Sequence, residues 1–215
     1  MLLSDLSKSA ETDPLPPPLG SLCVSQWHGG DLVAPLVEVA AEVPVALVFN
    51  GISHAVMMAT PQDLAEFAVG FALSEGVVQR PEECRDVEVH THAAGTPDAS
   101  CSVHMEIAPR QFVRLKERRR ALAGRTGCGV CGIDSLQALD LHPEPVAAPA
   151  WREGLDVATI LRPFGTLGAR QVLNVRAGSL HAAGWATPAG ELTEVLEDVG
   201  RHNALDKLFG RLALS

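Results

Sequence analysis

The residues best suited to covalent chemistry are two cysteines that stand three positions apart in a glycine-rich turn, Cys128 and Cys131. They occur in the sequence Gly127-Cys-Gly-Val-Cys-Gly132, and glycine lets the backbone adopt conformations that other residues avoid. Such a turn leaves both sulfur atoms open to a reaction partner. A thiol at the start of a helix also has its thiolate favoured by the free amide groups there. The C-x-x-C pair therefore predicts a reactive or metal-binding dithiol.

Three chemistries use a C-x-x-C pair, and the rest of the sequence favours them unequally. A structural zinc site needs two more ligands, but Cys23, Cys84 and Cys101 are scattered singly. A zinc deaminase needs an upstream H-x-E motif, whereas this chain has only His181-Ala-Ala downstream, so that class is excluded. A thioredoxin-type exchanger carries its pair in a βαβ unit, whereas this pair lies late in the chain. Zinc binding and disulfide exchange both stay open as alternatives.

A dense basic segment lies directly before the cysteine turn. Seven basic residues and one acid give residues 110–125 a net charge of +6, so the rest of the chain carries −15 within a total of −9. A thiol with a pKa near 8.5 needs about 2 kcal/mol to become roughly half thiolate at neutral pH. One arginine at about 6 Å supplies that much at an effective dielectric of about 20. Arg125 alone is therefore able to activate Cys128, and the other bases suit phosphate groups.

A second polar cluster lies near the end of the sequence, in the stretch Glu197–Lys207 (EDVGRHNALDK). Its leucines recur at helical spacing, which predicts a helix from about residue 200 that packs on a core. Arg201, His202 and Asn203 open this helix, where backbone amides bind anions. A plain alternative has Asp198 capping the helix and the other polar side chains solvated. The spacing alone leaves both interpretations open.

Strands and helices alternate along the chain and must position these two clusters. Strands are expected within 32–51 (with a turn at Asn50-Gly51), 87–92, 101–107, 172–176 and 181–185. Helices are expected from Thr60-Pro61 to about Gly76, around 134–139, at 156–161 and from about 200. This alternation favours an α/β or α+β layered fold. We expect a disordered, proline-rich tail (1–20), an N-terminal strand-and-helix part (21–109) and a part with the cysteine turn (110–215).

Composition narrows the class of protein further. A net charge of −9 and nine aromatic residues without tyrosine argue against a nucleic-acid binder. No run of 18 apolar residues is present, which argues against a membrane span. Five cysteines without an export signal favour a reducing compartment, so a cytoplasmic location is expected.

Together, the cysteine turn, His181-Ala-Ala and the EDVGRHNALDK stretch resemble the FdhD family of formate dehydrogenase accessory sulfurtransferases. Shorter motifs between residues 37 and 211 agree, including Thr60-Pro61-Gln-Asp63 and Glu75-Gly76. The resemblance implies a cytidine-deaminase-like α/β sandwich with a smaller N-terminal strand-rich part, but without deaminase chemistry. Because family members continue past the EDVGRHNALDK helix, the chain is expected to be C-terminally short relative to them.

The resemblance also implies a function. The chain is expected to take a persulfide sulfur from a cysteine desulfurase and pass it to the molybdenum of the bis-guanylyl molybdopterin cofactor of formate dehydrogenase. Cys128 matches the carrier cysteine and Cys131 its partner, and the cofactor is a substrate, with no resident metal or cofactor expected. A homodimer is a further expectation. The alternatives are a dithiol-disulfide oxidoreductase and a zinc-stapled adaptor for the formate dehydrogenase apoprotein. The expected cofactor-binding residues are Arg125, His181, Arg201, His202 and Asn203.

Overall fold

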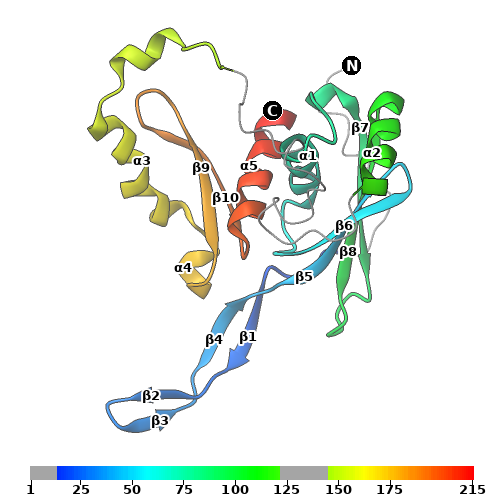
Figure 1. Cartoon of the computed structure of the whole chain (residues 1–215). Helices are drawn as coiled ribbons and strands as arrows, with labels where there is room; N and C mark the ends of the chain where they lie inside the picture. Colours follow the sequence, from blue (N-terminus) through cyan, green and yellow to red (C-terminus); the bar gives the residue numbers. More distant parts are fainter. Residues whose placement is uncertain (1–13, 122–144) are drawn as a thin grey trace.

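The computed structural model describes residues 14–121 and 145–215, and its largest sheet has four strands in the order β6-β5-β8-β7 (Figure 1). These strands are β5 (Val43–Phe49), β6 (Ile52–Ala59), β7 (Cys84–His92) and β8 (Ser100–Ile107). Strand β5 runs antiparallel to β6 and parallel to β8, which is antiparallel to β7. Every second residue from Val103 to Ile107 is buried, as expected for a strand with one face on the core.

The turn predicted at Asn50-Gly51 is confirmed as the connection between β5 and β6. Both residues have a positive φ, 46° and 75°, which a two-residue hairpin turn demands and which asparagine and glycine adopt most readily. The Asn50 side chain also joins this turn to β8. Its Oδ1 accepts a hydrogen bond from the Ile107 N–H at 2.8 Å, and its Nδ2 donates to the Ile107 carbonyl at 3.2 Å. The strands predicted at 87–92 and 101–107 are likewise confirmed within β7 and β8.

Three helices complete this part of the molecule: α1 (Leu64–Ser74), α2 (Pro109–Ala121) and α5 (Arg201–Leu214). The core lies between the sheet and α1 and includes Phe49 and Phe67, both fully buried. The predicted start of α1 at Thr60-Pro61 is wrong by three residues. Thr60 is bonded to the end of β10 and the residue after it instead of capping the helix, because its N–H donates to the Asp198 carboxylate and its hydroxyl accepts a hydrogen bond from the Val199 N–H. Asp63, in a left-handed conformation, directly precedes the helix.

Helices α1 and α5 cross in direct backbone contact. A Cβ atom added to Gly70 of α1 would overlap the carbonyl oxygen of Asp206. A Cβ atom added to Gly210 of α5 would overlap the carbonyl oxygen of Glu66. Because only glycine fits at both positions, the crossing fixes α5, and with it the turn from which α5 begins.

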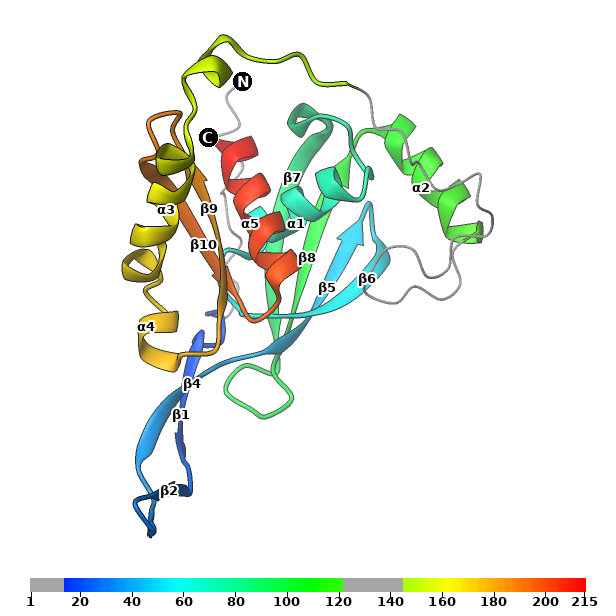
Figure 2. The same ribbon diagram turned by 60° about the vertical axis from the view of Figure 1, so that its left-hand side comes forward.

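A second, two-stranded sheet lies between α5 and α3 in both views (Figures 1 and 2). Its strands are β9 (His181–Ala186) and β10 (Leu192–Asp198), with α3 (Val157–Arg170) and α4 (Asn174–Ala177) preceding them. The expected strand at 181–185 is confirmed, and the helix expected at 156–161 extends to Arg170. The prediction of a strand at 172–176 is wrong, because a helical turn, α4, forms there. The helix expected around 134–139 lies outside the described residues.

Residues 19–40 form an arm that extends away from the rest of the molecule in both views (Figures 1 and 2). The arm consists of β1 (Leu19–Cys23) paired with β4 (Leu36–Ala40), and β2 (Gln26–His28) paired with β3 (Asp31–Val33). Strand β1 begins at Leu19, so the predicted tail ends two residues too late. Residues 1–13 of that tail lie outside the described residues. Arg176 of α4 donates to Glu38 at 2.8 Å and ties the arm to the body.

Two short 3-10 helices, Pro81–Glu83 and Ala150–Gly154, complete the regular structure of the described residues. The predicted layered α/β fold is confirmed, with helices packed against two separate sheet layers. Within residues 14–121 and 145–215, no helix is both long and apolar enough to cross a bilayer.

Candidate functional site

Four of the predicted site residues lie together where β10 ends and α5 begins. His181 pairs with Asp198 across the β9–β10 ladder, and α5 starts three residues later at Arg201. His181, Arg201 and His202 are exposed, whereas Asn203 is buried. Three exposed donors beside the N-terminus of a 14-residue helix suit an anionic group. We call His181, Arg201 and His202 the α5-start cluster.

A fully buried ion pair fixes the backbone beneath this cluster. The Lys207 Nζ atom lies 2.8 Å from Oδ2 of Asp198, and neither side chain is exposed. The ammonium group also donates to the carbonyl oxygens of Thr60 at 3.0 Å and Glu197 at 3.3 Å. All three of its hydrogens therefore have an acceptor, as a buried ammonium requires. Lys207 is thus part of the scaffold and does not belong to a solvated helix face.

Asp198 also binds donors from two further segments of the chain. Its Oδ2 accepts from the Thr60 N–H at 3.0 Å, and its Oδ1 accepts from the Gly200 N–H at 2.8 Å and from Asn203 Nδ2 at 3.0 Å. The same Asn203 nitrogen donates to the carbonyl oxygen of Met58 at 2.8 Å. Asn203 therefore holds the turn in place, and its predicted contact with a ligand stays a prediction.

Glu197 positions the residues that lead into His181. Its carboxylate accepts hydrogen bonds from the backbone N–H groups of Leu173 at 2.9 Å and Asn174 at 2.8 Å. These bonds cap the N-terminus of α4 and explain why a helix forms where a strand was predicted. The Asn174 side chain then accepts from the Leu180 N–H at 2.9 Å, directly before β9 begins. Glu197, Asp198, Asn203 and Lys207 thus build the scaffold on which the α5-start cluster is exposed.

One carboxyl group, Asp206, lies beside the α5-start cluster. Burial raises its pKa from 3.8 to about 6, and the charge of Glu75 acts in the same direction. A hydrogen bond from the Ser74 hydroxyl, at 2.7 Å, and the charge of His202 oppose this rise in pKa. His202 lies four residues before Asp206 on the same helix, and its charge acts on this carboxyl group. Asp206 therefore takes up a proton at a higher pH than an exposed aspartate does.

The remaining predicted site residues, Cys128, Cys131 and Arg125, lie outside the described residues, so their roles stay predictions. Of the basic segment, Arg110 and Arg114 are described, and both are exposed on α2. These two guanidinium groups add exposed positive charge on α2, separate from the α5-start cluster.

Two of the other cysteines are excluded as reactive thiols by their burial. Burial raises the pKa of Cys84 to about 12, and the charge of Glu83 adds to the effect. Burial also raises the pKa of Cys101. Because the thiolate is the nucleophile, neither cysteine suits sulfur transfer. The third described cysteine, Cys23, is exposed on the arm.

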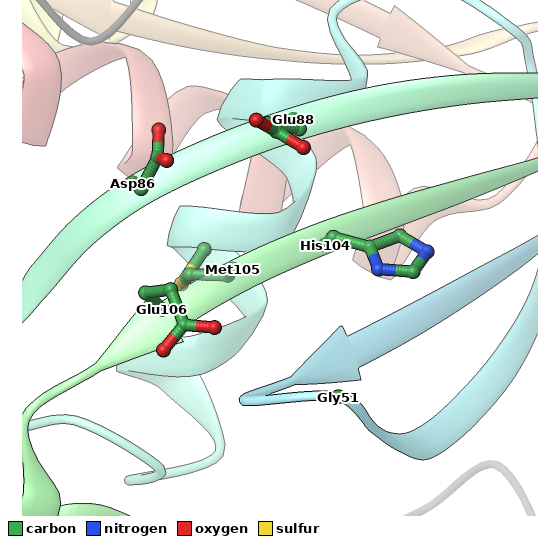
Figure 3. A pocket seen from close by; sticks show the side chains of 6 residues that line it. All are labelled: Gly51, Asp86, Glu88, His104, Met105 and Glu106. Atoms are coloured by element: carbon green, nitrogen blue, oxygen red, sulfur yellow. The ribbon is translucent and has the colours of Figure 1, made fainter.

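A cavity of about 270 Å³ opens on the outer face of β7 and β8 (Figure 3). Asp86, Glu88 and Glu106 contribute three carboxylates to its lining, which repel phosphate groups. Burial, aided by the neighbouring charge of His90, lowers the pKa of His104 in the same lining, so this histidine adds little positive charge at neutral pH. In the described part of the chain, no three metal-ligating side chains converge on one position. The α5-start cluster is therefore a better binding site for an anionic ligand than this cavity.

Sequence reasoning missed the scaffold role of Lys207 and Glu197. The helical spacing of the apolar residues indicates that Lys207 is buried. Lys207 lies three residues after Ala204 and directly before Leu208, on the apolar face of the helix. A lysine on such a face must find buried acceptors. The cap that Glu197 provides to α4 had no local indication, because it joins residues more than 20 positions apart.

Known proteins resemble this chain over most of its length. Residues 40–215 match the model of the FdhD/NarQ family. A protein of Cupriavidus necator named sulfur carrier protein FdhD is 48% identical over 211 residues, 98% of this chain and 70% of that protein. A protein of Chromobacterium violaceum with the same name is 54% identical over 194 residues, 90% of this chain and 70% of that protein. The chain thus spans about 70% of the length of these relatives.

A solved structure supports the fold. It comes from Desulfotalea psychrophila, is described as that of a formate dehydrogenase accessory protein, and superposes with a TM-score of 0.60 at 23% identity. The match covers 94% of this chain and 69% of the other, so nearly all of the chain has a counterpart of the same layered architecture.

Proposed function

The chain belongs to the FdhD/NarQ family, and we propose that it is a sulfur carrier that serves formate dehydrogenase by delivering sulfur to its molybdenum cofactor. The observation that carries this proposal is the family match over residues 40–215, a range that includes both the cysteine turn and the α5-start cluster. Relatives named as sulfur carriers are 48% and 54% identical to it. A cytoplasmic location, where thiols stay reduced, fits this function.

In the proposed loading step, Cys128 receives sulfur from a persulfide on a cysteine desulfurase. The Cys128 thiolate attacks the terminal sulfur of the donor persulfide. A new S–S bond forms at Cys128, the S–S bond of the donor breaks, and the donor cysteine leaves as a thiolate. No electron is gained or lost overall, so loading needs no further reactant. The basic segment before the turn favours the required thiolate, and Cys131 is the partner thiol.

The outer sulfur of the Cys128 persulfide then passes as sulfide to the molybdenum of a bis-guanylyl molybdopterin, the substrate of this sulfurtransferase. This transfer takes two electrons, which a small thiol reductant supplies as it is oxidised to its disulfide, and Cys128 returns to the thiol. We place the phosphate groups of this substrate at the α5-start cluster. Arg201 and His202 are exposed there beside the free amides of a helix N-terminus, and the Asp198–Lys207 pair holds the turn rigid. Arg125 is expected to approach the same phosphates from the cysteine turn.

Guanosine diphosphate is a probe for this placement, because it carries the guanylyl phosphates without the pterin. Loss of one charge-assisted hydrogen bond costs about 1.5–3 kcal/mol, so Arg201→Ala or His202→Ala should raise the Kd at least tenfold by isothermal titration calorimetry. Arg85→Ala, which removes an exposed arginine from β7, is the matched control and should leave the Kd unchanged. Equal Kd values for all three variants would place the nucleotide elsewhere.

Two protein partners are expected from this function, a cysteine desulfurase and formate dehydrogenase. A second copy of the chain is a third expected partner, for a structural reason. The arm supports the homodimer, because it exposes 73% of Trp27 and 73% of Leu36 on a narrow ribbon. Such a ribbon is barely stable alone, and a second copy would cover its apolar side chains. Light scattering should report a dimer that Trp27→Ser weakens; a monomer at all concentrations would contradict this assembly.

The function itself is tested by formate dehydrogenase activity in a bacterium that lacks its own protein of this family. The chain should restore activity, and Cys128→Ala should abolish it, whereas Cys23→Ser is a matched control on the exposed arm. Activity with Cys128→Ala would contradict the carrier role. Equal loss with Cys131→Ala would favour disulfide exchange, and stoichiometric bound zinc would favour the adaptor.

A further inference from the structure

Three of the eight histidines of the chain gather on one face of the β7–β8 strand pair. His90 and His92 lie on β7 and His104 lies on β8, and we call them the β7–β8 histidines. Side chains alternate between the two faces of a strand, and Val103 is buried in the core, so His104 faces away from the core. The ladder pairs His90 with Ser102, which places this serine on the same outer face. Three imidazoles from two strands therefore share the outer face of the sheet.

Ring nitrogens of two of these histidines converge on a single oxygen atom, Ser102 Oγ. The Nε2 atom of His92 lies 2.9 Å from this oxygen, and the Nε2 atom of His104 lies 3.1 Å from it. With metal–ligand bonds of about 2.1 Å, neighbouring ligand atoms of an octahedral ion are about 3 Å apart. The two nitrogens are therefore spaced around the oxygen as ligands around one ion are. A hydrogen-bonded serine gives the same distances, so the surroundings of the two rings decide between a simple bridge and a metal site.

A third imidazole holds the ring of His104 in place. The ring centres of His90 and His104 are 4.8 Å apart, and the two rings meet edge to face at 80°. The Nε2 atom of His90 in turn lies 3.4 Å from a carboxylate oxygen of Glu88. Partners behind a ligand that fix its orientation are typical of metal-binding histidines. A simple serine bridge does not require this support, whereas a metal site benefits from it.

The charges around His104 favour a cation. Asp86, Glu88 and Glu106 line the same cavity as this histidine, and their three carboxylates attract an ion with two positive charges (Figure 3). Burial, aided by the neighbouring charge of His90, lowers the pKa of His104, and the neutral imidazole is the form that binds a metal ion. Two convergent ring nitrogens, a fixed ring and a negative surrounding thus occur together at one place.

We propose that His92 and His104 bind a divalent transition-metal ion of the class that prefers imidazole ligands, which includes Ni²⁺, Cu²⁺ and Zn²⁺. The two Nε2 atoms are its protein ligands, the Ser102 hydroxyl lies beside them, and water fills the other positions. His90 is a positioning residue that orients His104. Among the described residues no three histidine, cysteine or carboxylate side chains meet at one point, and this site requires only two. The site stands whether or not the chain carries sulfur.

Calorimetric titration with Ni²⁺ tests the proposal, in a full chain whose cysteine turn carries Cys128→Ser and Cys131→Ser so that its thiols do not compete. This chain should bind one Ni²⁺ ion. Adding His104→Gln keeps a hydrogen-bonding group beside the serine but removes the imidazole, and should raise the Kd at least tenfold. Adding His181→Ala removes an exposed histidine from β9 instead, and as the matched control it should leave the Kd unchanged. Absence of Ni²⁺ binding, or equal Kd values with the two histidine variants, would overturn the proposal.

A second measurement locates the ion on the sheet. An ion that joins β7 to β8 should slow the hydrogen exchange of amides in both strands when Ni²⁺ is added, and His92→Gln should remove this protection. Protection that His92→Gln leaves unchanged would overturn the proposal. So would Ni²⁺ binding that persists with His104→Gln but is lost with Glu106→Gln, since the ion would then lie among the carboxylates of the cavity.

Discussion

Replacing Lys207 with methionine tests the scaffold beneath the α5-start cluster. Methionine has a similar length and opens no large cavity, so the main effect is electrostatic. Asp198 would remain fully buried without its cation, keeping only the hydrogen bonds from two backbone amides and one side-chain amide. Removing one partner of a buried ion pair costs about 3–5 kcal/mol. The carbonyls of Thr60 and Glu197 also lose a donor.

Arg211→Met is the matched control on the same helix. Arg211 is 38% exposed and lies 2.9 Å from both Asp63 and Glu66. Because water screens exposed pairs, each contributes about 0–1 kcal/mol, so this variant should lose roughly 1 kcal/mol. Urea unfolding followed by far-UV circular dichroism compares the two variants. Lys207→Met should lose at least ~2 kcal/mol more than the control. An equal loss in the two variants would refute the buried-pair argument.

Further predictions concern the helix crossing, the acid beside the site and the buried thiol. Gly70→Ala should be strongly destabilised or insoluble, because its Cβ overlaps the backbone of α5. Gly165→Ala has open space around its Cβ, so its free energy of unfolding in urea should rise by about 0.5–1 kcal/mol. Similar free energies of unfolding for the two variants would contradict the backbone contact between α1 and α5. Asp206, with its pKa raised from 3.8 to about 6, favours the folded state below pH 4 and loses this contribution as the pH rises through 6. Asp206→Asn should therefore remove part of the fall in Tm between pH 5 and 7.5, and an unchanged slope would contradict the raised pKa. With iodoacetamide at pH 8, Cys23 should be alkylated in the folded chain and Cys84 should not; equal labelling of the two would refute the burial argument.

Local patterns predicted the elements whose causes are themselves local. The Asn50-Gly51 turn needs only two residues that tolerate a positive φ, and both are read directly from the sequence. The helix from about residue 200 was predicted from leucine spacing and begins at Arg201. The strand β9 likewise matched its prediction. These elements place the α5-start cluster, which explains why its three members, all of them predicted site residues, lie exposed together.

Non-local contacts explain the failures. The segment 172–176 has the β-branched residues of a strand, but the Glu197 carboxylate binds its backbone amides and stabilises a helical turn. Thr60 and Pro61 resemble a helix start, but Thr60 is bonded to Val199, 139 residues away. The burial of Lys207 follows from Asp198 and Thr60 meeting it inside the fold. No window of sequence contains these partners together.

The most direct test of the sulfur-carrier function is the intact mass of the chain after incubation with a cysteine desulfurase and free cysteine. The chain should gain a sulfur atom that a reductant removes. Cys128→Ala should abolish this addition, and Cys23→Ser should retain it. A folded chain that gains no sulfur, or one that still gains it with Cys128→Ala, would contradict the carrier role of Cys128.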